Sequence, residues 1–473
     1  MINKISLKAD EYLDEAICLL KSLISFKSVA AEPTGENAPY GEECAKALNF
    51  TQSYLKEQGF TVKNFEGHAI TAAFDEREPE VGVLAHLDVV PTEGQSWHSD
   101  PFTAEIRDGR IYGRGAIDDK GPAAAIITAM KMIRDSVNRG EITLKRNMRL
   151  ILGSNEENGS TDMEYYTSKE AFPPMLFTPD GSFPVITVEK GMVRYDMTAP
   201  AKPVPEGGRA VLSIKADGAY NAVPEEAFAR VKGFEITSLA GMAKRFSPEG
   251  ITFMFEKDET DENIVCINSR GKGAHASTPE KGHNALTALI GLLSKLMFDG
   301  GVKDIVRQLA NRFPYGDNEG KYAGLKLTDE KNGNLSVVLS RLIFDGQTLT
   351  AGFDCRYPPI VDAKETVAAF DRTAEECRMA GRAVMASEPH AANEDSKLVR
   401  TLLAVYEDFT GKPGKCLAIG GGTYVHDTAE GVAFGAEWSD ENHMHGADEF
   451  IGIEELRDDI VIYTEALLRL LTE

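Results

Sequence analysis

Residues 81–91 read VGVLAHLDVVP, an apolar run in which His86 and Asp88 are the two ionisable residues. The run predicts a strand over Val81–Val90. Because side chains alternate between the two faces of a strand, residues two apart point the same way. A buried carboxylate needs a partner, and a metal ion would suit both side chains. For this pair taken alone, a histidine satisfied within the core is the alternative.

The composition limits what the chain can be. Its 473 residues, 42% hydrophobic and 26% charged, are enough for two globular domains. The net charge of −23 argues against a nucleic-acid partner, whose phosphates would be repelled. The six cysteines form no C-x-x-C pair, and neither a signal peptide nor a membrane-spanning apolar stretch is recognisable. We therefore expect a cytoplasmic protein with no membrane partner.

Helix and strand signals alternate through the first 190 residues, as in an α/β sheet covered on both sides. The signals predict three helices and five strands, at 12–25, 42–59 and 121–139, and at 61–65, 70–73, 81–90, 148–152 and 175–178.

The pattern changes after about Lys190. Strand-like alternation with a few helices, one of them predicted at Pro224–Lys232, indicates an α+β region that interrupts the first domain. Two strand–helix units, near 210–232 and 335–380, suggest an internal duplication. The predicted organisation is a first domain begun at 1–190, an inserted domain at 191–388, and the completion of the first domain at 389–473.

Acidic and imidazole residues gather in five places, each just past a strand or at a turn. They are His86 with Asp88, Asp118 with Asp119, Glu156 with Glu157, Asp180, and His445. In open α/β sheets, sites form beyond the carboxyl ends of the strands, so we expect the clusters after Leu84, Leu152 and Phe177 to lie at one edge. Nitrogen and oxygen ligands without a thiolate suit zinc, manganese or cobalt.

Two of these clusters allow a more specific interpretation. Glu156 and Glu157 are expected in an extended stretch, so their side chains point in opposite directions. One can hold a metal ion while the other stays free as a general base; a solvated acidic loop is the alternative. Asp118 precedes the helix expected from Gly121, where it could cap the helix or bridge two metal ions.

Together these motifs resemble those of the di-metal aminoacylase/carboxypeptidase family of metallopeptidases, and within it the bacterial PepV-type dipeptidases. The motifs, in order, are HLD at 86–88, GRGAIDDKG at 113–121, NEE at 155–157, Asp180, NAVP at 221–224, GKGAHASTPEKG at 271–282, RYP at 356–358, GGGTY at 420–424 and HGADE at 445–449. The resemblance spans nearly the whole chain. It implies a mixed-sheet α/β peptidase domain with an inserted α+β lid domain of two ferredoxin-like halves.

The resemblance implies two divalent metal ions, zinc or alternatively manganese or cobalt. One would be held by His86, Asp118 and Asp180. The other would be held by Asp118, Glu157 and His445, with Asp118 as the bridging ligand. His443, two residues before His445, is the alternative ligand, although the spacing to the following Asp-Glu pair favours His445.

The resemblance also assigns the catalytic groups. Asp88 would orient His86. Glu156 would activate the water that bridges the metal ions and then protonate the leaving amine. His275, from the inserted domain, would stabilise the tetrahedral oxyanion.

Substrate binding is assigned in the same way. Asn221, Arg356 and the loop Gly420, Gly421 and Gly422 would hold the free carboxylate of the substrate. A surface ion pair is the alternative for Arg356. The implied activity is hydrolysis of dipeptides with a free C-terminal carboxylate, by a monomer, with a dimer as the alternative. The competing functions are an N-acyl amino acid deacylase or desuccinylase, and a non-catalytic metal-binding protein.

Overall fold

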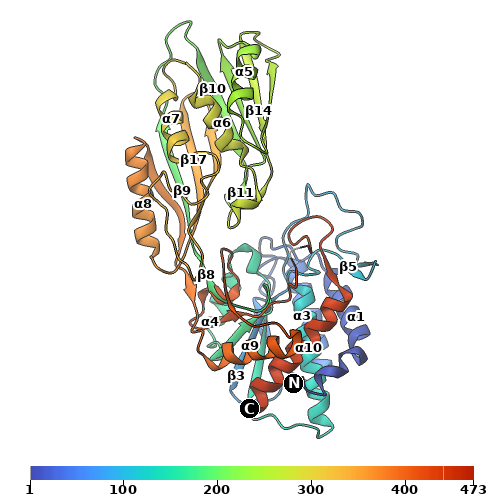
Figure 1. Cartoon of the computed structure of the whole chain (residues 1–473). Helices are drawn as coiled ribbons and strands as arrows, with labels where there is room; N and C mark the ends of the chain where they lie inside the picture. The colour runs from blue at the N-terminus through green and yellow to red at the C-terminus, as the bar shows by residue number, and fades with distance from the viewer. Residues whose placement is uncertain (1, 440) are drawn as a thin grey trace. The chain divides into compact units, whose positions relative to one another are not determined.

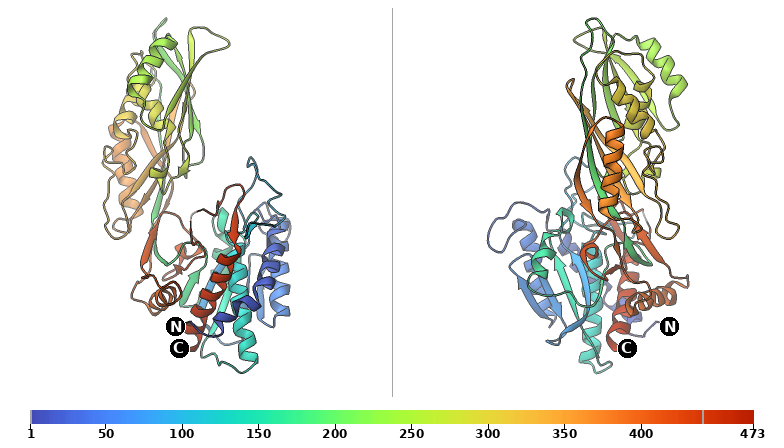
Figure 2. Two further views of the ribbon diagram at one scale, coloured as in Figure 1. Left: turned by 45° about the vertical axis from the view of Figure 1, so that its right-hand side comes forward. Right: turned by 90° about the vertical axis from the view of Figure 1, so that its left-hand side faces the viewer.

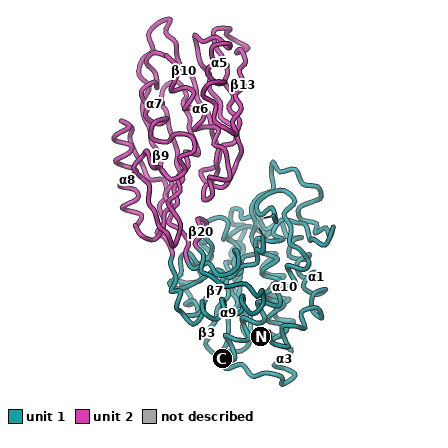
Figure 3. Tube along the Cα trace, in the orientation of Figure 1, with its two compact units in different colours: residues 1–187, 391–417, 422–473 teal, residues 188–390, 418–421 magenta. Residues whose placement is uncertain are grey.

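The computed structural model describes residues 2–439 and 441–473. It divides into two compact units, which are drawn in different colours in Figure 3. Unit 1 comprises Met1–Thr187, Ala391–Leu417 and Gly422–Glu473, and unit 2 comprises Val188–His390 and Ala418–Gly421. Each unit has a hydrophobic core of its own.

A nine-stranded mixed sheet forms the centre of unit 1 (Figure 1). Its strand order is β1 (Thr61–Phe65), β2 (Ala69–Ala73), β6 (Asn147–Gly153), β3 (Pro79–His86), β7 (Met175–Thr178), β21 (Val432–Ala433), β8 (Val185–Glu189) and β19 (His390–Ala391), with β20 (Cys416–Ile419) paired to β8. The strands β6 and β7 run parallel to β3 on either side of it, so the carboxyl ends of these three strands share one edge.

Helices and short elements complete unit 1. The helices are α1 (Leu13–Ile24), α2 (Glu42–Glu57), α3 (Lys120–Asn138), α4 (Thr161–Thr167), α9 (Lys397–Thr410) and α10 (Ile453–Thr472), with 3₁₀ turns η1 (Ser6–Glu11), η2 (Glu156–Asn158) and η4 (Tyr424–Asp427). A small sheet has the order β22 (Phe450–Gly452), β5 (Arg110–Tyr112) and β4 (Glu105–Arg107).

The helix α3 is buried along most of its length. Small residues, Ala123, Ala124 and Ala125, are fully buried in its first turns, so neighbouring elements can approach its backbone closely. The C-terminal helix α10 packs against α3, and the two lie side by side in all views (Figure 2). This packing fixes the start of α3, which follows directly on Asp118 and Asp119.

Unit 2 is built on an eight-stranded antiparallel sheet. Its strand order is β13 (Thr252–Lys257), β14 (Ile264–Arg270), β12 (Glu226–Lys232), β10 (Ala210–Asp217), β16 (Ser336–Phe344), β17 (Thr348–Tyr357), β9 (Gly191–Pro200) and β18 (Ala380–Ser387). The remaining elements are the pair β11 (Ala222–Val223) and β15 (Ala274–His275), the turn η3 (Pro279–Lys281), and the helices α5 (Ile236–Phe246), α6 (Ala285–Ser294), α7 (Lys303–Arg312) and α8 (Ala363–Glu376).

The predicted fold class, an α/β domain interrupted by an α+β insertion, is confirmed. The helix predicted at Pro224–Lys232 is wrong, because this segment is strand β12. Ala227, Ala229 and Val231 are buried and alternate with more exposed residues, which is the two-residue period of a strand. Pairing to β10 on one side and β14 on the other outweighs the helical propensity of the segment.

Every helix within residues 2–439 and 441–473 is too short or too polar to cross a membrane.

Candidate active site

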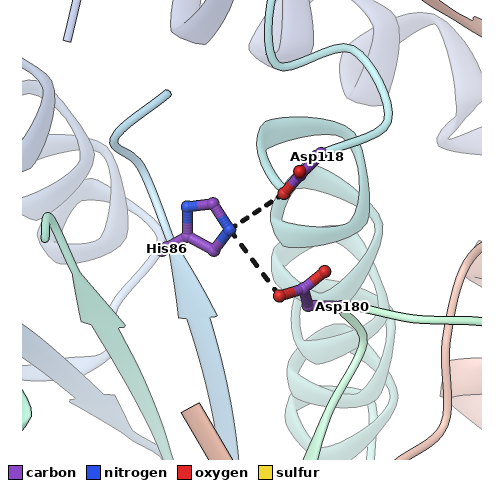
Figure 4. Close-up of side chains that lie close together, drawn as sticks. All are labelled: His86, Asp118 and Asp180. Atoms are coloured by element: carbon purple, nitrogen blue, oxygen red, sulfur yellow. Dashed lines mark hydrogen bonds and ion pairs between the residues drawn. The ribbon is translucent and has the colours of Figure 1, made fainter. Parts of the chain in front are cut away.

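His86 is the last residue of β3 and lies at the edge where β3, β6 and β7 end. Its side chain is fully buried. Its Nε2 atom lies 3.0 Å from Oδ1 of Asp118 and 3.8 Å from Oδ2 of Asp180 (Figure 4). We call His86, Asp118 and Asp180 the His86 group. One donor atom from each lies within 4.8 Å of the others, which is close enough to hold a single metal ion.

A second group shares Asp118 with the first. His445 Nε2 lies 2.7 Å from Oδ2 of Asp118 and 3.2 Å from Oε1 of Glu157. We call Asp118, Glu157 and His445 the His445 group; its donor atoms also lie within 4.8 Å of one another. The two oxygens of Asp118 therefore face two different groups, as a carboxylate that bridges two metal ions would.

Asp88 differs from its predicted place, because β3 ends at His86 and Asp88 lies beyond the strand. Nδ1 of His86 contacts the backbone carbonyl of Asp88 at 3.0 Å, while the nearest carboxylate oxygen is 3.5 Å away. The Asp88 carboxylate instead accepts hydrogen bonds from the backbone N–H groups of Glu156, at 3.2 Å, and Glu157, at 3.1 Å. Asp88 thus fixes His86 and the turn that carries both glutamates.

The extended conformation predicted for Glu156 and Glu157 is also wrong, since both lie in the 3₁₀ turn η2. In a helix of three residues per turn, consecutive side chains are about 120° apart, so they still diverge. Glu157 belongs to the His445 group. Among the described residues, Glu156 belongs to neither group of candidate ligands.

Asp162 was not predicted, yet it supports the same turn. Its Oδ2 accepts hydrogen bonds from the backbone N–H groups of Ser154, at 2.7 Å, and Asn155, at 2.9 Å, and from the hydroxyl of Tyr424. The Tyr424 ring packs edge-on against the imidazole of His86, with centroids 6.0 Å apart. The buried pair of Tyr424 and Asp162 therefore links His86, a candidate ligand, to the residues that lead into η2.

Gly153 is the sequence signal for this arrangement. A Cβ atom at this position would lie 2.1 Å from the Tyr424 hydroxyl and 2.3 Å from the Asp162 carboxylate, so the contact requires glycine. The sequence around Asp162 does not predict its contact with Tyr424, because Asp162 lies in the first turn of α4, where an aspartate is common.

Burial and mutual repulsion act together on the carboxyl groups of the site. The pKa of Asp180 lies well above its ordinary value, first because of burial and then because of the nearby Asp118 carboxylate. Burial likewise raises the pKa of Glu156, and Asp180 adds to the effect. For Glu157, burial and Asp118 raise the pKa. The protein alone leaves excess negative charge here, which divalent cations would neutralise.

The two histidines offset part of this charge. Burial would raise the pKa of Asp118, but hydrogen bonds from His445 and His86 bring it below its ordinary value. Burial would lower the pKa of His445, but Asp118 and Glu157 raise it to about 11. The buried Oε1 of Glu157 has the 3.2 Å ion-pair contact with His445 Nε2 but no further hydrogen bond. These donors fit divalent metal ions, which would bind in exchange for the imidazole protons.

The two neighbouring histidines differ in position. His445 contacts Asp118 and Glu157, whereas Nδ1 of His443 lies 3.2 Å from the carbonyl of Ala447. Among the described residues, His443 belongs to neither candidate group.

The substrate residues predicted in the insertion lie together within unit 2. His275, in β15, pairs with Ala222 of β11, and the carbonyl of Asn221 accepts a hydrogen bond from Ala276. Nδ1 of His275 lies 2.7 Å from the hydroxyl of Ser277. Two short paired strands therefore bring the main chain of His275 next to that of Asn221 and Ala222.

Arg356, near the end of β17, is buried, which rules out the surface ion pair considered for it. Its guanidinium donates to both carboxylate oxygens of Asp354, at 2.6 and 3.1 Å, and to the carbonyl of Gly420, at 2.8 Å. Gly420 approaches Ser277 so closely that a Cβ atom would lie 2.6 Å from the serine Cβ. Gly421 falls in unit 2 and Gly422 in unit 1.

Comparison with known proteins identifies the relatives of this chain. The protein YtjP of Bacillus subtilis (strain 168) is 33% identical over 458 residues, covering 95% of this chain and 96% of YtjP. The Beta-Ala-Xaa dipeptidase of Lactobacillus delbrueckii subsp. lactis is 31% identical over 463 residues, covering 96% of each chain. The crystal structure of human carnosine dipeptidase 1 shares the fold, with a TM-score of 0.61 at 15% identity over 99% of this chain and 98% of that one.

The family is shown by the extent of the match. The model described as Peptidase family M20/M25/M40 matches residues 82–469, which include every candidate metal ligand. The family resemblance expected from the motifs is confirmed. The chain belongs to peptidase family M20/M25/M40 and is a metallopeptidase.

Proposed function

We propose that this chain hydrolyses dipeptides with a free C-terminal carboxylate and uses two divalent metal ions. The shared position of Asp118 carries the proposal, because its two oxygens face two groups of candidate ligands while Glu156 lies in neither. A relative of nearly the same length, named as a Beta-Ala-Xaa dipeptidase, supports a substrate of two residues.

The His86 group and the His445 group would each hold one metal ion. Imidazole nitrogens and carboxylate oxygens suit zinc, manganese or cobalt. When bound, such a pair of ions polarises the scissile carbonyl and lowers the pKa of water between them.

Glu156 would act as the general base. It takes a proton from the attacking water as the new C–O bond forms, and returns it to the amine nitrogen as the C–N bond breaks. Burial, which raises the pKa of Glu156, favours a group that both accepts and returns a proton. The two backbone hydrogen bonds to Asp88 hold η2, and so the main chain of Glu156, in place.

Residues of unit 2 would recognise the substrate. His275 would donate to the oxyanion of the tetrahedral intermediate. Arg356 uses three N–H groups on Asp354 and Gly420, which leaves two of its five for a substrate carboxylate. Asn221 and the backbone N–H groups of Gly420–Gly422 would complete the carboxylate site. We also propose that residues 191–388 serve as a lid that limits peptide length, in a functional monomer.

Metal reconstitution tests this function. The protein is stripped with a chelator, zinc, manganese or cobalt is restored singly, and hydrolysis of dipeptides, tripeptides, C-amidated dipeptides and N-acyl amino acids is measured. We expect metal-dependent cleavage of free dipeptides in clear preference to the other compounds. Preference for N-acyl amino acids would instead identify a deacylase or desuccinylase, and two bound ions without any hydrolysis would identify a metal-binding protein.

A further inference from the structure

We propose that the buried ion pair between Arg114 and Glu449 is a brace for the His445 group, and that binding of the second metal ion depends on it more than binding of the first. This inference rests on the proposed dinuclear site. Glu449 is fully buried and Arg114 is 1% exposed, although no candidate metal group contains either residue among those described. Their atoms Oε2 and Nη1 lie 2.5 Å apart.

The carboxylate of Glu449 holds the turn that presents Asp118. Its Oε1 accepts hydrogen bonds from the backbone N–H groups of Ile117, at 3.0 Å, and Asp118, at 3.3 Å. Its other oxygen is occupied by Arg114. The main chain of the bridging ligand is therefore tied to a residue of the C-terminal segment.

The guanidinium of Arg114 extends the brace to His445. Its Nη2 donates to the backbone carbonyl of His445, at 3.2 Å, and to the side-chain oxygen of Gln95, at 2.8 Å. The amide nitrogen of Gln95 donates to the same carbonyl of His445, at 2.8 Å. The guanidinium also lies over the ring of Trp97, with its carbon 5.1 Å from the ring centroid. The side chains of Arg114 and Gln95 thus both hold the main chain of His445, one of the candidate ligands.

The loop that carries His445 needs such support. His443, His445 and Asp448 all have positive φ, at 58°, 61° and 57°, a conformation that costs free energy for residues with a side chain. The carboxylate of Asp448 is anchored in turn by the backbone N–H of His98, at 2.8 Å. Without these contacts, the loop would relax toward conformations that withdraw the imidazole of His445.

The His86 group shares the brace only through Asp118, and its other two members depend on other contacts. His86 is fixed by the end of β3 and by the carbonyl of Asp88, and Asp180 follows strand β7. Among the described residues, neither His86 nor Asp180 has a hydrogen bond or ion pair with Arg114 or Glu449. Loss of the brace should therefore weaken the two metal sites unequally.

Glu449→Gln tests this brace, because the amide keeps the size of the side chain but loses the negative charge facing Arg114. Metal-free protein is titrated with Zn²⁺ by calorimetry, and retained metal is counted after gel filtration. We expect wild type to bind two ions, and the variant to bind one of them about 10- to 100-fold more weakly and the other with a much smaller loss of affinity, since both groups share Asp118. The matched control is Glu170→Gln, which removes a partly buried charge paired with Arg149 in the same unit and should leave both affinities unchanged.

A milder variant covers the case in which Glu449→Gln fails to fold. Gln95→Ala removes one donor to the His445 carbonyl at a half-buried position and should weaken the same ion by a smaller factor. Equal weakening of both ions, or unchanged binding in the braced variants, would overturn the inference while leaving the proposed function intact. Fewer than two ions bound by wild type would overturn both.

Discussion

The charged residues of the two units are arranged in opposite ways. At the edge of the sheet in unit 1, the carboxylates of Asp118, Glu157 and Asp180 outnumber the imidazoles near them, and burial and repulsion raise the pKa of two of the three. In unit 2, the buried charge of Arg356 is already matched by Asp354. An excess of carboxylates is typical of a site that binds a cation. A balanced pair such as Arg356 and Asp354 is typical of a site that recognises a substrate.

Glu156→Gln should have the largest effect, because it removes a charge of the unit 1 site without removing a candidate ligand. We expect kcat to fall by about 10²- to 10⁴-fold, the usual scale for loss of a general base. Metal content, measured on the same sample, should stay at the wild-type value. Loss of metal together with activity would make Glu156 a ligand and would contradict the division of roles within η2.

His275→Ala asks whether unit 2 takes part in chemistry as well as recognition. Loss of an oxyanion donor typically lowers kcat by about 10²- to 10³-fold. KM should change far less, because the hydrogen bond strengthens mainly in the transition state. Steady-state kinetics on a cleaved dipeptide separate the two constants. An unchanged kcat would restrict unit 2 to substrate binding.

Asp162→Asn tests a buried charge in unit 1 that lies outside the candidate ligands. Burial raises the pKa of Asp162 to about 6, above its ordinary value of 3.8. Between these values the unfolded chain has lost the proton that the folded protein retains, so this group favours folding at low pH and the benefit is lost as the pH rises toward 6. The stability of wild type relative to the variant should therefore fall by about 3 kcal/mol from pH 3 to pH 7.

Chemical denaturation of metal-free wild type and Asp162→Asn across that pH range measures this difference. Because both proteins share every other titrating group, subtraction isolates Asp162. A difference that stays constant with pH would mean that the Tyr424 hydroxyl and the backbone donors of Ser154 and Asn155 keep Asp162 ionised.

Arg356→Lys changes the geometry of the Asp354 ion pair in unit 2 and should have the smallest effect. Lysine keeps the positive charge but loses the planar fork that contacts both oxygens of Asp354. We expect KM for free dipeptides to rise about 10-fold, with a smaller change in kcat, as for loss of one charged hydrogen bond. Dipeptides and their C-terminal amides are compared, and an equal rise in KM for both would remove Arg356 from carboxylate recognition.

The strongest sequence signals came from residue types placed after strands. His86 ends β3, whereas Asp180 and the Glu156–Glu157 pair follow β7 and β6, and parallel pairing brings those strand ends together, as expected. The sequence could not give the end of β3, because the apolar residues VVP continue past His86 as a strand would. It also favoured a helix for β12, whose pairing partners lie elsewhere in the chain.

Local sequence patterns could not predict the contacts that support the candidate ligands. The hydroxyl of Tyr424 meets Asp162 across 262 positions, and Arg114 meets Glu449 across 335. Each of these residue types is common at surfaces and helix ends, so only the folded chain shows which carboxylate supports which ligand. Motif spacing identified the groups that could bind metal, while the geometry identified what holds them in place.

The arrangement of the bridging carboxylate also affects biosynthesis. Asp118 emerges early in translation, whereas His445 emerges near the end, after all of unit 2 has been made. The nascent chain thus contains Asp118 long before it contains Glu449 and α10, which hold the turn at Asp118 and pack against α3. A product truncated before His445 would lack this candidate ligand, so under the proposed function release of an unfinished chain would not yield an active peptidase.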